Sequence, residues 1–99
     1  MTLPNHKTRI IATIGPASDS PAMLERLMRA GLDIARLNFS HGDFRGHGES
    51  IARIRAAARA TGRRVAILAD LPGPKMRLGR IDPEPIQLRP DDAFTLTTR

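Results

Sequence analysis

The sequence predicts an α/β fold with parallel strands, and three observations lead to it. Short apolar runs alternate with stretches of helical spacing, in the order strand, helix, strand, helix, strand. The connections between the apolar runs hold 19 and 25 residues, which is long enough for crossover helices. The runs are nearly continuous, as in strands covered on both faces. Parallel pairing with right-handed crossovers is therefore the default.

The first strand is expected over Thr8–Ile14, where a Gly-Pro pair ends it. A helix then begins at Pro21, because Ser20 suits the N-cap and proline suits the first helical position. Gly31 suits the left-handed residue that follows a helix. Both ends of this helix are therefore marked in the sequence.

The second strand is expected over Ile34–Phe39, and the second helix runs from about His47 to Thr61, where Gly62 ends it. The third strand is expected over Val65–Leu71, and a Pro-Gly-Pro turn breaks it sharply. These residues complete an α/β unit that we place at 1–74.

The character of the chain changes in 75–99. Short β-like runs at 76–81, 86–88 and 94–98 alternate with turns rich in proline and aspartate. We interpret this segment as the beginning of a small, incomplete antiparallel β domain.

Length and composition exclude several classes of protein. The chain of 99 residues is long enough for one domain. It has no cysteine, which excludes disulfides and thiol chemistry. It has no apolar run of the roughly 20 residues that a membrane span needs, and no apolar signal segment at its start. We therefore expect a cytoplasmic protein with no membrane partner.

The net charge of +6 comes from fourteen arginines and two lysines. Such a surplus can attract a polyanion, or it can simply solvate helix faces. Several arginines fall on the second predicted helix, but no aromatic residues alternate with them for base stacking. Nucleic-acid binding is therefore only a minor alternative.

The second strand carries three polar side chains on one face. Strand residues alternate between faces, so Arg36, Asn38 and Ser40 lie opposite Leu37 and Phe39. Leaving such groups buried without partners costs about 1–3 kcal/mol for each neutral group and more for the charge. Either they pair with one another and with Asp70, or they face a polar ligand.

Other candidate residues have equally plain alternatives. Asp70 either caps a loop or anchors a cation. Lys75 and Arg77 are either solvated charges or anion contacts. His41 and His47 are six residues apart, but no third ligand of matching spacing supports a metal site.

Four segments, taken together, resemble the amino-terminal part of pyruvate kinase over about residues 7 to 80. They are Thr13–Ser18, Ala35–Gly42, Asp70 and Gly73–Arg77. The resemblance implies a (β/α)8 TIM barrel with a small β domain inserted after the third strand. This chain would supply the first three strands and two helices of the barrel, and the opening of the inserted antiparallel β domain.

The resemblance implies phosphoryl transfer from phosphoenolpyruvate to ADP, giving pyruvate and ATP in glycolysis. Arg36 matches the substrate-binding arginine of the family. The residues near the nucleotide phosphates match Asn38, Phe39, Ser40, His41 and Arg77. The ligands of a monovalent cation match Asn38, Ser40, Asp70 and the backbone carbonyl of Leu71.

Two departures from the family pattern bear on the cations. Leu71-Pro72 stands where the family commonly has Thr-Lys, which removes a hydroxyl and a positive charge. Lys75 stands where potassium-dependent members have glutamate, so its ammonium is expected to replace K⁺ and make the ion dispensable. The ligands for Mg²⁺ and the proton-handling groups lie on later strands in the family, so this segment is expected to hold no catalytic residue.

We therefore expect a truncated or partial pyruvate kinase that is inactive and poorly stable alone. A homo-oligomer, a tetramer in the family, is expected only for a full-length chain. Two rival hypotheses remain: a non-catalytic α/β module that binds phosphate or another anion, and a basic segment that binds nucleic acid.

Overall fold

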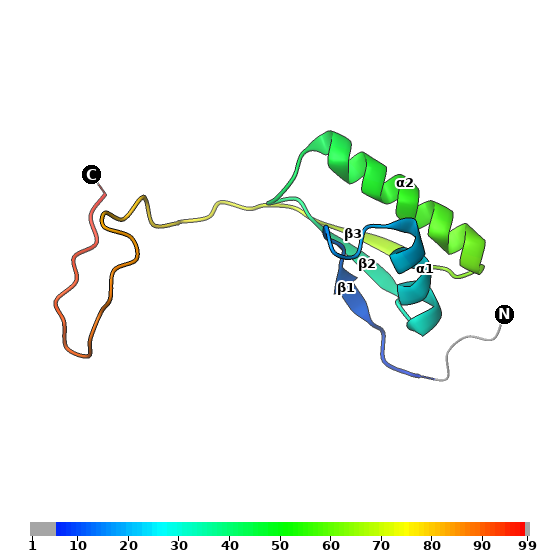
Figure 1. Cartoon of the computed structure of the whole chain (residues 1–99), viewed down its shortest axis with the longest axis horizontal. Helices are drawn as coiled ribbons and strands as arrows, with labels where there is room; N and C mark the ends of the chain where they lie inside the picture. Colours follow the sequence, from blue (N-terminus) through cyan, green and yellow to red (C-terminus); the bar gives the residue numbers. More distant parts are fainter. Residues whose placement is uncertain (1–5, 99) are drawn as a thin grey trace.

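The computed structural model describes residues 6–98. A parallel sheet of three strands, in the order β1-β2-β3, packs with two helices (Figure 1). The elements follow one another as β1 (Ile11–Thr13), α1 (Pro21–Ala30), β2 (Ile34–Asn38), α2 (Phe44–Thr61) and β3 (Ala66–Asp70). The predicted order of strands and helices and the parallel pairing are confirmed.

The helices begin and end at capping residues. The Ser20 hydroxyl accepts a hydrogen bond from the Met23 N–H at 3.3 Å, and α1 ends at Gly31 in the left-handed region. Helix α2 starts at Phe44, three residues before the expected His47, because the Asp43 carboxylate accepts the N–H of Gly46 at 2.7 Å. The expected start of α2 lies too late because it does not take Asp43 as the cap.

The strands are shorter than expected. β1 pairs only with β2, and the pairing of Ile11 with Ile34 is the first in register. At the other end of the sheet, Asn38 lies opposite Asp70 on β3. The length of each strand is therefore set by how far it overlaps its neighbour. An apolar run in the sequence does not show where this overlap begins and ends.

The core lies between the sheet and the helices. Ala35 and Leu37 of β2 are buried, and they share one apolar cluster with Leu24, Met28 and Ile54 of the two helices. Since α1 and α2 also contact each other, both helices cover the same face of the sheet. No helix among residues 6–98 is both long and apolar enough to cross a membrane.

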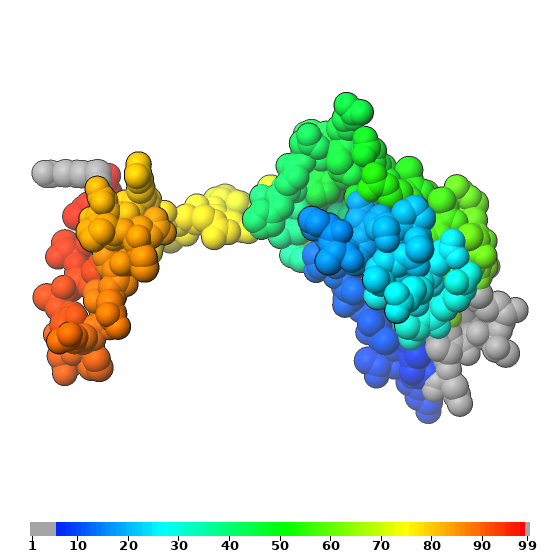
Figure 2. All heavy atoms as spheres, viewed as in Figure 1, coloured from blue at the N-terminus to red at the C-terminus, as the bar shows by residue number. Residues whose placement is uncertain are grey.

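The chain leaves this body after β3. Figure 2 shows a narrow segment joining the body to the last residues. The short strands expected at 76–81, 86–88 and 94–98 are a wrong prediction, because residues 71–98 contain no strand. A strand needs a neighbouring edge to pair with, and here Leu78, Leu88 and Leu96 are exposed instead of packed. The boundary between 1–74 and 75–99 stays a prediction.

Both outer strands of the sheet leave one edge unpaired, and such edges recruit other chains. The face away from the helices also exposes Ile11 and Leu68, which are 53% and 38% accessible. We expect the isolated 99-residue chain to lose its circular dichroism over a broad temperature range and to associate in light scattering. A sharp transition at monomeric mass would contradict this expectation.

Candidate functional site

The carboxyl ends of the three strands meet at one edge of the sheet. In parallel α/β folds this edge is where binding residues gather. Two cavities, of about 310 and 370 Å³, lie there on the loops that follow β1, β2 and β3. Both are lined by Gly42 and His47, so the loop between β2 and α2 separates them.

Arg36 joins all three strands. Its Nε donates to Asp70 Oδ2 at 2.9 Å, and its Nη2 donates to the same oxygen. Its Nη1 donates to the Thr13 hydroxyl of β1 at 2.8 Å. Pairing with Asp70, one of the two alternatives left open by the sequence, is therefore confirmed. The side chains of Arg36 and Asp70 keep 31% and 44% of their surface exposed, so a ligand can still reach them.

The next polar residues of β2 shape the loop that follows it. Asn38 Oδ1 accepts the N–H of Ser40 at 3.1 Å, which closes a tight turn. The Ser40 hydroxyl in turn accepts a hydrogen bond from Lys75 Nζ at 3.0 Å. Lys75 thus reaches back from the segment after β3 to the loop after β2.

Two of the four residues expected to hold K⁺ are already bonded to cationic side chains. The Asp70 carboxylate binds the Arg36 guanidinium, and the Ser40 hydroxyl binds the Lys75 ammonium. The residues present therefore fit a fixed ammonium at this place better than a mobile ion. No three His, Asp or Glu side chains gather as metal ligands within residues 6–98, and the location of the Mg²⁺ ligands stays a prediction.

Two contacts on His47 hold the loop from the side of α2. His47 Nε2 donates to the backbone carbonyl of His41 at 2.7 Å. Its ring stacks on Phe39, with centroids 4.2 Å apart and an angle of 18° between planes. The only site role weighed for His47 from the sequence is that of a metal ligand, so this support of the loop is not among the expectations.

The structure differs from the expected set of site residues at Thr13 and Arg77. Thr13 binds Arg36 but was not a candidate, although it lies directly opposite Arg36 in the strand register. Arg77 is exposed, and among residues 6–98 no hydrogen bond or ion pair joins it to the site. Its expected place near the nucleotide stays a prediction.

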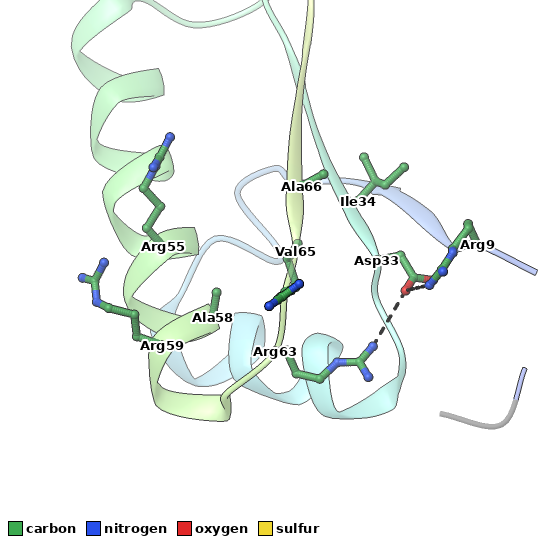
Figure 3. Close-up of a pocket in the computed structure, with 10 residues that line it drawn as sticks. Arg9, Asp33, Ile34, Arg55, Ala58, Arg59, Arg63, Val65 and Ala66 are labelled. Carbon is green, nitrogen blue, oxygen red and sulfur yellow. Dashed lines mark hydrogen bonds and ion pairs between the residues drawn. The ribbon is translucent and has the colours of Figure 1, made fainter. Parts of the chain in front are cut away.

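A third cavity, of about 690 Å³, lies at the opposite end of the sheet. Its basic lining residues are Arg9, Arg55, Arg59, Arg63 and Arg64. Arg9 and Arg63 both point to Asp33, the acidic residue of the lining (Figure 3). In barrel folds this end serves stability, because binding residues gather at the carboxyl ends of the strands.

Asp33 is held in its charged form. Its Oδ2 accepts the N–H of Ile10 at 3.0 Å, and Arg9 donates to its Oδ1 at 3.2 Å. The backbone N–H of Ile10 lowers the pKa of Asp33 most. Burial raises this pKa by a smaller amount, and the hydrogen bond and the charge of Arg9 lower it further. The carboxylate therefore ties the residues before β1 to the start of β2.

This geometry defines the class of protein: an open run of βα units from a barrel, with polar side chains and a guanidinium at the carboxyl edge. Residues 5–99 match the family model for the pyruvate kinase barrel domain. The chain belongs to the pyruvate kinase family. None of the comparisons favours the two rival hypotheses.

Individual relatives agree with this assignment. A pyruvate kinase of Thermococcus litoralis is 50% identical over 99 residues, which are all of this chain and 21% of that protein. One of Geobacillus stearothermophilus is 54% identical over 83 residues, 84% of this chain and 14% of the relative. A cytosolic pyruvate kinase isozyme of Nicotiana tabacum is 43% identical over 98 residues, which are 98% of this chain and 19% of that protein. The chain thus spans about a fifth or less of these relatives.

Asp33 makes a pH-dependent contribution to stability. Because its pKa is lower in the folded state, this contribution is complete above the unfolded pKa of about 3.9 and is lost as the pH falls through the folded value. Asp33→Asn is expected to lower the urea midpoint at neutral pH and to reduce its further fall in acid.

The measurement is a series of urea titrations between about pH 6 and pH 3 on a chimera in which this chain replaces the matching segment of the Thermococcus litoralis enzyme. Asp82→Asn, a change of the same kind at an exposed position, is the control. Parallel acid limbs for Asp33→Asn and the unchanged protein would rule out this contribution.

Proposed function

We propose that this chain is part of the barrel of an enzyme that transfers a phosphoryl group from phosphoenolpyruvate to ADP, giving pyruvate and ATP. The observation that supports it is the position of Arg36 at the carboxyl edge of the sheet, between Thr13 and Asp70. Arg36 is therefore a partly exposed cation that two neighbouring strands hold in place. It lies at the edge where binding residues gather in barrel folds.

Phosphoryl transfer asks for positioned positive charge rather than covalent help. The charge on the phosphoryl oxygens must be neutralised while attacking and leaving oxygens stay in line. The planar guanidinium of Arg36 can hold two phosphoryl oxygens at once. Its hydroxyl and carboxylate partners keep it aimed along the strand edge.

The nucleotide is proposed to lie on the loop after β2. The residues assigned to its phosphates are Asn38, Phe39, Ser40, His41 and Arg77. His41 is exposed on this loop and lines the larger of the two cavities of the edge, which leaves room for a ligand. The ammonium of Lys75, bound to Ser40, adds positive charge there.

Two cations belong to the proposal. Mg²⁺ would shield the charge on the transferring phosphate, and its ligands are proposed to lie outside residues 1–99. The K⁺ site would be Asn38, Ser40, Asp70 and the Leu71 carbonyl. Since Lys75 donates to Ser40, we propose that its ammonium supplies the charge that K⁺ supplies elsewhere, and that the ion is dispensable.

The biological setting follows the activity. We propose a glycolytic enzyme that works in the cytoplasm. The Nicotiana tabacum relative is a cytosolic isozyme, which supports this location. A homo-oligomer is proposed for the complete enzyme, and neither a membrane nor a nucleic acid is a proposed partner.

Arg36 can be tested in a chimera in which this chain replaces the matching segment of the Thermococcus litoralis enzyme. Arg36→Ala is expected to lower kcat/KM for phosphoenolpyruvate by more than about 100-fold, because a cation aimed at the phosphoryl group is lost. Steady-state kinetics measure this, and Arg26→Ala, an exposed arginine of α1, is the matched control. A loss below about tenfold, roughly 1.4 kcal/mol, would contradict the role of Arg36.

Lys75 can be tested in the same chimera. Lys75→Glu removes the fixed ammonium from Ser40 and places a carboxylate near the proposed cation donors. We expect the unchanged chimera to work equally well in Na⁺ and K⁺ buffers, and the variant to need K⁺, with at least about tenfold higher kcat in its presence. Lys7→Glu, the same change at the chain's other lysine, is the control. If the kcat of the Lys75→Glu variant did not depend on K⁺, the proposal that the Lys75 ammonium replaces the ion would be contradicted.

A further inference from the structure

We infer that His47 is a positioning residue that holds the Ser40–Asp43 loop in the shape that binds the nucleotide. The inference rests on the proposed function, which assigns the nucleotide to this loop. It adds a residue that touches neither substrate: His47 acts through the backbone that it supports.

The start of α2 determines where His47 lies. The Asp43 carboxylate caps the helix at Gly46, and the Asp43 carbonyl accepts the N–H of His47 at 3.0 Å. The imidazole is therefore carried on the first turn of an 18-residue helix that is anchored in the core through Ile54. A rigid element thus presents the ring to the loop.

Three residues of the preceding chain contact this one ring. Phe39 stacks on it, and the His41 carbonyl accepts its Nε2 hydrogen. Gly42 has φ +76° and passes so close that a Cβ there would lie 3.3 Å from His47 Nε2. The loop is therefore wrapped around the imidazole, and a left-handed glycine permits the close approach.

The loop has little other support. His41, Gly42 and Asp43 are exposed. Apart from the ring, the loop's hydrogen bonds within residues 6–98 are the turn at Asn38, the contact of Lys75 with Ser40, and the bonds of Asp43 to the first turn of α2. Without the ring, residues 41–43 would sample more conformations, and the nucleotide would have to order them on binding. The cost would appear as weaker nucleotide binding.

Arg36 does not share this dependence. It is held by Thr13 and Asp70 on the neighbouring strands, and none of its hydrogen bonds within residues 6–98 involves His47. Loss of the imidazole should therefore weaken the binding of ADP and spare that of phosphoenolpyruvate. General damage to the fold would instead change the KM for ADP and the KM for phosphoenolpyruvate together.

The experiment compares His47→Phe with the unchanged Thermococcus litoralis chimera. Phenylalanine retains an aromatic ring to stack on Phe39 but removes the donor to the His41 carbonyl. We expect the KM for ADP to rise about fivefold, the size of one hydrogen bond, with the KM for phosphoenolpyruvate changed less than about twofold. His47→Gln, which restores an N–H donor, should recover part of the loss. His6→Phe, the same change before β1, is the control.

Amide hydrogen exchange of the same proteins supplies a readout independent of turnover. His47→Phe should speed exchange at residues 41–43 and leave the amides of β2 unchanged. Equal KM values for ADP, or unchanged loop exchange, would overturn the role of His47. If the unchanged chimera neither turns over nor binds ADP, the proposed function fails, and the exchange result alone then decides whether His47 holds the loop.

Discussion

The site depends on one guanidinium that bridges three parallel strands. Arg36 of β2 binds the Thr13 hydroxyl of β1 and the Asp70 carboxylate of β3, so one side chain couples the whole carboxyl edge. The bridge is possible because parallel register places Thr13 beside Arg36, and Asp70 two residues further along β3 than the direct partner of Arg36. Any slip of one residue would turn Arg36 toward the helices and lose both partners.

Much of this edge follows from residue patterns. Alternation along β2 correctly separates Arg36 and Asn38 from Ala35 and Leu37, which are buried. Glycine and serine likewise mark both ends of α1. The partner Thr13 could not be assigned, because a bond between strands depends on a register that no single run contains. The prediction of short strands after residue 74 was wrong for the same kind of reason. Local apolar runs do not show whether a neighbouring strand edge is present to pair with, and residues 71–98 form no strand.

The site residues are held by two separate systems. Strand neighbours fix Arg36, whereas the first turn of α2 supports the loop with His41, and Lys75 joins that loop to the chain after β3. A short loop on a rigid helix can adjust without moving the sheet. This division suits the two-substrate reaction proposed above, because each contact surface is held in place by its own set of neighbours.

The pair between Arg36 and Asp70 does not close the site, because it is weak. Both side chains keep about a third or more of their surface in water, and exposed pairs stabilise proteins by only about 0–1 kcal/mol. A phosphoryl group brings more negative charge and can offer two oxygens to the planar fork. Exchanging the carboxylate for such a ligand therefore costs little, while Thr13 keeps the guanidinium in place. We propose that pairing and ligand binding are successive states of this one arginine, so that the bond to Asp70 supports the site instead of opposing it.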